Sequence, residues 1–218
     1  MLAQFDAVLA ATPTSSQVQR PWRQTLPTLA GHGVVLRDLH ANDATSLLAS
    51  LGSADVTRFL SPPPDTVQGF ERFIKWAARE RSAGTHACFA VTLPTSDAAI
   101  GIFQVRKSCT LSGAAEWGFA IGSPFWGTGV FERGAALVLD FAFVTMDLRR
   151  LEARTAARNG RGNRALQKLG AVRQGHSREL LSLRGERLDQ VQWMMFAEDY
   201  LPSIEKASST LPGMPFAA

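Results

Sequence analysis

The sequence predicts an α/β (α+β) fold, with a mixed central sheet of six to seven strands flanked by about four helices. Three observations predict it. Between residues 115 and 156 the pattern reads strand, glycine turn, helix and strand, which is the order of a βαβ unit with parallel strands. Hairpin patterns over 87–105 and 171–196 add antiparallel strands on either side of that unit. Parallel and antiparallel pairs together make a mixed sheet.

The chain has 218 residues, of which 45% are apolar and 19% charged, and this composition is typical of one folded soluble domain. We expect 1–30 to be a loosely ordered N-terminal extension because prolines, among them Pro21, interrupt regular elements there. The domain itself is expected over 31–205, followed by a tail over 206–218. Because no apolar run is long enough to span a membrane and no signal peptide pattern is seen, we expect a cytoplasmic protein that does not bind membranes.

The first elements of the domain are one strand and two helices. Residues 33–37 form a β-type run. Either Asn42 or Asp43 is suited to cap a helix that spans 44–49. A proline-rich stop follows, and apolar residues then recur at helical spacing over 70–81.

The central elements are the first hairpin and the βαβ unit. Strands are expected over 87–93 and 99–105, and the strand over 115–121 is expected to pair onward from them. A helix over 131–143 then leads to a strand over 151–156.

The last elements are a short helix and a closing hairpin. The helix is expected over 162–169, ending at Gly170, which is suited to a left-handed cap. Strands over 171–183 and 188–196 then flank a turn at Gly185.

The net charge of +4 and the pI near 9.6 raise the question of nucleic-acid binding. Arginines crowd residues 149–178, but the segment lacks interleaved aromatic residues and any zinc or helix-turn-helix signature, so we expect no nucleic acid partner. Two alternatives remain for the segment: a solvated basic face, or a local field for the phosphates of a nucleotide. Cys88 and Cys109 lie in strand-like stretches without metal-ligand spacing, so we expect buried free thiols and no metal.

The most informative motif is the glycine turn Phe125-Trp126-Gly127-Thr128-Gly129-Val130-Phe131, which lies between the strand over 115–121 and the following helix. A glycine turn that opens a helix presents free backbone N–H groups and the positive end of the helix dipole, which together bind phosphate oxygens. The turn therefore predicts a phosphorylated cofactor. The alternative is an ordinary tight turn.

Two motifs at the expected separation then resemble a known family. Trp126-Gly127-Thr128-Gly129 is similar to a W-G-x-G turn, and the segment over 159–171 is similar to the pattern N-x-x-S-x-R-x-x-x-K-L-G-F. Both resemble the GNAT superfamily of acyl-CoA-dependent N-acetyltransferases, within it the RimJ/RimL-like branch that acetylates ribosomal proteins. Element order is similar over about residues 33 to 197. The chain departs from the pattern at Gly162, where the branch has serine, and at Leu166, where many superfamily members have the tyrosine that protonates the leaving thiolate.

The resemblance implies that acetyl-CoA is the co-substrate and that no metal takes part. It implies that the glycine turn wraps the pyrophosphate and that the strand around 119–121 pairs with the pantetheine arm. Arginines at the short helix would add charge-assisted bonds to phosphates, whereas Lys168 is as well explained as a surface lysine. The expected cofactor-binding residues are Phe119, Ala120, Ile121, Trp126, Gly127, Thr128, Gly129, Val130, Phe131, Asn159, Arg161, Gly162 and Arg164. For Asn159, helix capping is an equally open role.

Glu116 is the candidate catalytic base, because a carboxylate at the start of the strand that feeds the turn is able to accept the proton of the amine directly or through water. The alternative is a strand glutamate paired with an arginine. His32, His40, His86 and His176 are further bases in principle, but they share no spacing, and surface or packing roles account for them.

The function that follows is acetyl transfer from acetyl-CoA to a primary amine, a protein N-terminus or a small amine, by direct attack in a ternary complex. A catalytically weak acyl-CoA-binding module is the alternative, because Gly162 lacks a hydroxyl and Leu166 is not an acid. Whether edge strands of the closing hairpin pair two copies into a homodimer is left open.

Overall fold

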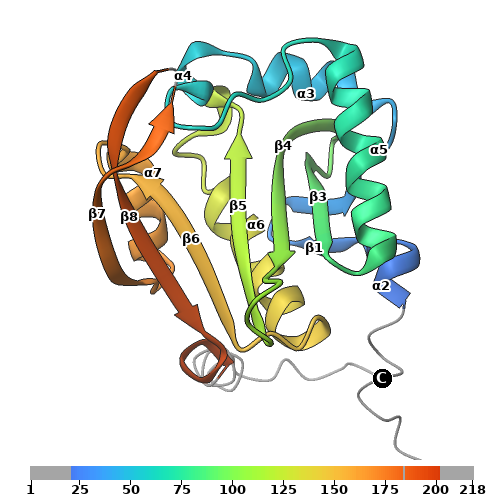
Figure 1. The fold of residues 1–218 in the computed structure, drawn as a ribbon. Coiled ribbons are helices and arrows are strands. Elements are labelled where there is room, and N and C mark those ends of the chain that lie inside the picture. Colours follow the sequence, from blue (N-terminus) through green and yellow to red (C-terminus); the bar gives the residue numbers. More distant parts are fainter. Residues whose placement is uncertain (1–20, 184, 202–218) are drawn as a thin grey trace, which may run out of the picture.

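The computed structural model describes residues 21–183 and 185–201, which form one eight-stranded sheet with helices on both faces (Figure 1). The order of the strands in the sheet is β1-β2-β3-β4-β5-β6-β8-β7. Their bounds are β1 Leu29–Gly31, β2 Val34–Asp38, β3 His86–Leu93, β4 Ser96–Lys107, β5 Ala114–Ile121, β6 Arg150–Ala156, β7 Val172–Leu183 and β8 Glu186–Phe196.

One strand pair in this sheet is parallel, and it determines where the sheet opens. Neighbouring strands pair antiparallel except β5 and β6, whose parallel register runs from Ala114 opposite Arg150 to Glu116 opposite Glu152. Beyond Glu116 the two strands diverge toward the side on which α4 lies (Figure 1). The later residues of β5 therefore keep one edge that β6 does not cover.

The helices pack in two layers. Their bounds are α2 Pro21–Gln24, α3 Asp43–Leu51, α4 Ala54–Thr57, α5 Val67–Ala83, η1 Ser123–Phe125, α6 Val130–Asp140, η2 Phe141–Thr145 and α7 Gly160–Lys168. Side chains of α3 and α5 pack on one face of the sheet, and those of α6, η2 and α7 pack on the other. No helix in the described part of the chain is long and apolar enough to cross a membrane.

The burial of successive residues along β3 shows that the sheet is covered on both faces. Phe89 and Val91 belong to the core with α6, whereas Ala90 between them belongs to the core with α3 and α5. All three are fully buried, because successive strand residues point to opposite faces and both faces carry helices. A strand of this kind reads as a continuous apolar run, as the sequence showed.

The structure confirms a mixed α/β sheet with the predicted hairpins and βαβ unit, but the sheet has eight strands instead of six to seven. The additional strand is β1. The short helices α2 and α4, of four residues each, were also not predicted. Elements this short leave no periodic pattern in a sequence, because one turn of helix or three residues of strand give too few positions.

The N-terminal prediction is wrong for its last ten residues. Residues 1–20 lie outside the described part, but 21–30 contain α2 and the start of β1. Pro21 is the first residue of α2, where its missing N–H group costs nothing, and Trp22 is buried with its ring edge-on to Phe141. The expected tail over 206–218 lies outside the described residues.

Three local predictions also need correction. The side chain of Asn42 makes no capping bond; the helix begins at Asp43, whose carboxylate is buried, accepts a bond from the backbone N of His40 and pairs with Arg37. Cys109 is exposed after the end of β4, whereas Cys88 is buried as expected. The short helix begins at Gly160, two residues earlier than predicted.

Candidate functional site

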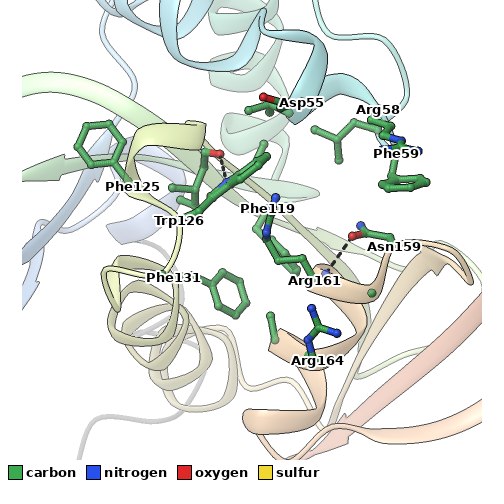
Figure 2. A pocket seen from close by; sticks show the side chains of 18 of the residues that line it. Asp55, Arg58, Phe59, Phe119, Phe125, Trp126, Phe131, Asn159, Arg161 and Arg164 are labelled. Carbon is green, nitrogen blue, oxygen red and sulfur yellow. Dashed lines mark hydrogen bonds between the residues drawn. The ribbon is translucent and has the colours of Figure 1, made fainter.

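Two adjoining cavities lie where β5 and β6 diverge. The first has a volume of about 430 Å³ and lies among α4, the glycine turn and the start of α7 (Figure 2). The second has a volume of about 510 Å³ and lies among the loop after α4, α5, β4, β5 and β6. Both are of the size of small-molecule sites. The residues that line both cavities are Phe59, Leu60, Phe119, Ala120 and Asn159.

The glycine turn forms one wall of the first cavity. Gly127 and Gly129 have φ values of +75° and +80°, in the left-handed region that glycine adopts without strain. Gly129 is the N-cap of α6, and no side-chain capping bond is made there. The first amides of a helix have no partner within the helix, so this end of α6 offers N–H donors and a positive dipole end to an anion.

Two side chains hold the shape of the turn from within. The hydroxyl of Thr128 donates to the carbonyl of Phe125 at 2.7 Å. Arg133 donates from Nη2 to the carbonyl of Thr128 at 3.2 Å, so its guanidinium folds back over the start of its own helix. A cation at this helix end opposes the dipole, which makes a bound anion more favourable there.

The start of α7 forms the opposite wall. The Asn159 side chain accepts a hydrogen bond from the backbone N of Gly162 at 3.0 Å, which is the capping role that the sequence left open. A Cβ at Gly162 would lie 2.6 Å from Nδ2 of Asn159, so the close approach of the two residues depends on glycine. The capping geometry thus explains why a residue larger than glycine would displace Asn159.

Asn163 ties this wall to the sheet. Its Oδ1 accepts bonds from Thr155 Oγ1 at 2.6 Å and from Trp193 Nε1 at 2.9 Å, and its Nδ2 donates to the carbonyl of Asn159 at 2.8 Å. The same Nδ2 lies within bonding distance of the carbonyls of Ala156 and Ala157. One amide group therefore fixes β6, β8 and the start of α7 relative to one another.

A stacked pair joins the two walls. The Arg161 guanidinium carbon lies 3.5 Å from the centre of the Trp126 ring, and the Trp126 indole donates to the carbonyl of Ile121 at 2.8 Å. In Figure 2 the Arg161 side chain extends from α7 toward Trp126, and Arg164 lies one turn further along the helix. Positive charge is therefore concentrated at α7, as the cluster of arginines in the sequence indicated.

Ten of the thirteen predicted cofactor residues line the first cavity. They are Phe119, Ala120, Ile121, Trp126, Gly127, Phe131, Asn159, Arg161, Gly162 and Arg164. Thr128, Gly129 and Val130 do not line it: Gly129 caps α6, and the Val130 side chain is buried in the core. Lys168 is exposed and lies outside both cavities.

Sequence reasoning missed the wall formed by α4 and the residues after it. Asp55, Val56, Arg58, Phe59 and Leu60 line the first cavity, with Arg58 and Phe59 facing it from above the sheet in Figure 2. This segment lies about a hundred residues before Asn159 in the chain and carries no motif. Only tertiary packing brings it to the site.

Glu116 lies in the second cavity, apart from the glycine turn. Its carboxylate accepts a bond from Arg106 at 3.1 Å and lies 3.7 Å from Arg154. The arginine-paired arrangement that the sequence left as an alternative is therefore present. The geometry brings Glu116 together with Phe119 and Ala120 on one strand, but not with the glycine turn.

All four histidines fall within the described residues, and none of them lines either cavity. His86 is buried beside Trp76, with Nε2 3.2 Å from Oε1 of Gln104, and burial lowers its pKa. His176 pairs with Asp189 on the closing hairpin. Leu166 is fully buried in the core, so its position contributes no group to the cavities.

Comparison with known proteins agrees with this architecture. The acetyltransferase (GNAT) domain family matches residues 34–172. The protein named "Uncharacterized N-acetyltransferase p20" from Bacillus licheniformis is 23% identical over 176 residues, covering 80% of this chain and 99% of that protein.

Two solved structures share the fold. RimJ of Mycobacterium smegmatis, solved in complex with CoA-disulfide, superposes with a TM-score of 0.70 at 18% identity, covering 80% of this chain and 89% of that one. The ribosomal-protein-S5-alanine acetyltransferase of Vibrio fischeri superposes with a TM-score of 0.72 at 17% identity, covering 80% and 98%. The family match spans well over half of the sequence and includes the glycine turn, the diverging strands and the start of α7. The chain belongs to the GNAT family of acetyltransferases.

Proposed function

We propose that the protein transfers the acetyl group of acetyl-CoA to a primary amine by direct attack within a ternary complex. The observation that carries this proposal is the pair of adjoining cavities. One is walled by arginines and helix N-termini, the other is largely apolar and contains Glu116, and they share the wall at Phe119 and Ala120. A cofactor in the first cavity and an amine in the second would meet at that shared wall.

The residues of the first cavity fit the phosphorylated cofactor. The uncapped amides at Gly129 suit the pyrophosphate, and Arg161 and Arg164 suit phosphate oxygens as charge-assisted donors. The edge of β5 after Glu116 is free of β6 and is available to a pantetheine arm through its backbone. When bound, acetyl-CoA supplies a thioester that is already activated toward amines.

The remaining chemistry asks little of the protein. The amine nitrogen forms a bond to the acetyl carbon, the carbon–sulfur bond breaks, and the sulfur leaves with the electron pair as a thiolate. One proton leaves the amine and one reaches the thiolate. The protein's tasks are to align the two reactants, exclude bulk water and accept the proton of the amine.

Glu116 is the proton acceptor in this proposal. Glu116 and Ala120 lie on the same face of β5, four residues and therefore ~13 Å apart. Gly118 between them has no side chain, which leaves room along the strand. The spacing favours a route through water from the amine near Phe119 to the carboxylate, over direct contact. The thiolate takes its proton from solvent, because Leu166 offers none.

A catalytically weak acyl-CoA-binding module is the second candidate. The observations that favour it are the pairing of Glu116 with two arginines and the burial of Leu166 where a tyrosine acid would stand. Such a protein would use the first cavity alone.

Two measurements on the full chain separate these candidates. Thiol release from acetyl-CoA is followed with a panel of small amines and peptides, and CoA binding is measured by calorimetry. The panel includes alanine-initiated peptides, because the Vibrio fischeri relative is named for alanine of ribosomal protein S5. Amine-dependent thiol release supports the transferase. CoA binding without release for any acceptor would favour the binding module, and absence of CoA binding would contradict both. A cytoplasmic location, the absence of nucleic acid and membrane partners, and a homodimer remain predictions from the sequence.

A further inference from the structure

The second cavity is built mainly from apolar side chains. Its walls include the aromatic rings of Phe59, Phe70, Phe73 and Phe119 and the proline segment over 62–64. Phe70 and Phe73 come from one helix, with their ring centres 6.4 Å apart and nearly perpendicular. Moving an apolar body from water onto such a surface lowers the free energy, and the aromatic rings offer edge and face contacts to that body.

The charged groups of the same cavity leave no acidic surface. Among the described residues that line it, Glu116 is the only acid, and Arg154 also lines it. The Glu116 carboxylate already has Arg106 at 3.1 Å and Arg154 at 3.7 Å. A ligand with several ammonium groups would bury charges for which the described lining residues offer no second carboxylate, and unpaired buried charge is strongly unfavourable.

Two of the neutral polar groups that line the cavity, Gln104 and Thr155, direct hydrogen bonds to other residues of the protein. The Gln104 amide oxygen lies 3.2 Å from Nε2 of the buried His86 ring, so it faces that ring. The Gln104 amide nitrogen lies on the side of Gly118, 3.2 Å from where a Cβ of that residue would stand, and Gly118 lines the cavity. Thr155 in turn donates its hydroxyl proton to Asn163. Neither group presents a set of hydrogen-bond acceptors to a second ammonium group.

We propose that the second cavity accepts a primary amine carried on an apolar, aromatic-sized body without a second cationic group. This inference rests on the proposed function and specifies its acceptor class. It excludes polyamines and aminoglycosides, and among peptides it selects those whose first residue is large and apolar. The amine points to the wall shared with the first cavity, and the body lies against Phe73 and the proline segment.

The test uses the full-length protein with saturating acetyl-CoA and measures initial rates of thiol release. The acceptors are 2-phenylethylamine, butylamine, spermidine and tobramycin, with tetrapeptides that differ only in a first Phe or Lys. We expect kcat/KM to be about 10–100-fold higher for 2-phenylethylamine than for the other amines, and for the Phe peptide than for the Lys peptide. A difference of this size is what burial of an apolar group in a fitted pocket gives. Comparison of the rates for 2-phenylethylamine and for the Phe peptide shows whether a free amine or a peptide N-terminus is the preferred acceptor.

Three variants at two positions test the acceptor cavity directly. Phe73 lines the second cavity and not the first, so Phe73→Ala should lower kcat/KM for 2-phenylethylamine about tenfold while the KM for acetyl-CoA stays the same, and Phe73→Leu should retain most of the activity. Gln190→Glu adds a carboxylate to the cavity and should raise the relative rate with spermidine. Correct folding of each variant is checked by unaltered CoA binding.

Turnover of spermidine or tobramycin as efficient as that of 2-phenylethylamine, or a preference for the Lys peptide, would overturn the inference. A lack of thiol release with every acceptor would instead contradict the proposed transferase. In that case, calorimetry with CoA present decides the acceptor class: 2-phenylethylamine should bind and spermidine should not, and the reverse order would overturn the inference independently of catalysis.

Discussion

The Arg161 guanidinium lies over the Trp126 indole, with its central carbon 3.5 Å from the ring centre. Trp126 follows η1 and Arg161 lies in the first turn of α7, so the pair connects the two walls of the first cavity (Figure 2). The indole is itself held by its hydrogen bond to Ile121 at the end of β5. A cation kept beside the proposed phosphate site by a ring is both oriented and ready to interact with an anion.

We therefore expect Trp126→Leu and Arg161→Ala to be energetically coupled. The cation–π contact of an exposed arginine is worth about 0.5–1 kcal/mol, so a double-mutant cycle in urea unfolding should give a coupling free energy of that size. Trp126→Phe keeps an aromatic face and should retain part of it. Both single variants should also weaken CoA binding in calorimetry. Additive effects in the cycle would show that the stack contributes nothing.

Alanine at the two turn glycines should have unequal costs. Both residues have positive φ, which costs an alanine about 1–2 kcal/mol in unfolding free energy. At Gly127 a Cβ would enter open space, whereas at Gly129 it would lie 2.5 Å from Nη1 of Arg133. The alanine at 129 also has to move the Arg133 guanidinium away from the carbonyl of Thr128, so Gly129→Ala should be the more destabilising change by the loss of that bond. In an Arg133→Ser background the two costs should become similar, and a persistent difference in urea titrations would contradict this explanation.

Removal of the Asn163 amide should destabilise the whole C-terminal half of the sheet. Asn163→Ala leaves the Thr155 hydroxyl and the Trp193 indole N–H without their partner and removes the side-chain bond to the carbonyl of Asn159, and the loss of several such bonds costs about 2–4 kcal/mol. Asn163→Asp should be equally harmful, because an acid places an oxygen against backbone carbonyls. Thr155→Val removes one bond and serves as the control, with a cost of about 1 kcal/mol. Equal stability of the Ala variant and the wild type in urea unfolding would refute this role of Asn163.

Stability should fall below about pH 6.5 because of His86. Burial lowers the pKa of this ring below its usual value of 6.5, with Arg106 adding to the shift and Gln104 and Glu80 opposing it. The unfolded chain then binds a proton before the folded chain does, so unfolding becomes easier as pH falls from 6.5 toward the lowered value. His86→Leu should reduce this dependence by up to about 1.4 kcal/mol per pH unit in that window. The difference between the two proteins is read from urea unfolding at about pH 5 to 8, and identical pH profiles would speak against it.

Glu116→Gln distinguishes a base from an ion-pair partner. If the carboxylate accepts the proton of the amine, kcat should fall about a hundredfold or more while the affinity for CoA is unaltered. Arg106→Gln removes the nearer partner of the carboxylate and is the matched control, expected to change kcat only a few-fold. A Gln variant with nearly normal kcat would leave Glu116 with the structural role alone.

By itself, the sequence determined the class of fold, the order of its main strands and helices, and the glycine turn at the start of α6. These features depend on local rules: alternation in strands, helical spacing in α5 and α6, and the left-handed conformations of Gly127, Gly129 and Gly170, which glycine adopts without strain. The same rules failed at α2, β1 and α4, which are too short to show a period.

Which groups face one another across the site depends on tertiary packing. It brought Arg58 and Phe59 to a cavity whose motifs lie far along the chain, seated Arg161 on Trp126, and gave Asn159 a capping bond to Gly162. It also placed Glu116 between two arginines and away from the glycine turn. The physical reason is that β5 and β6 pair over only three residues before they diverge, and the length of that pairing is fixed by packing on both faces of the sheet instead of by any local pattern.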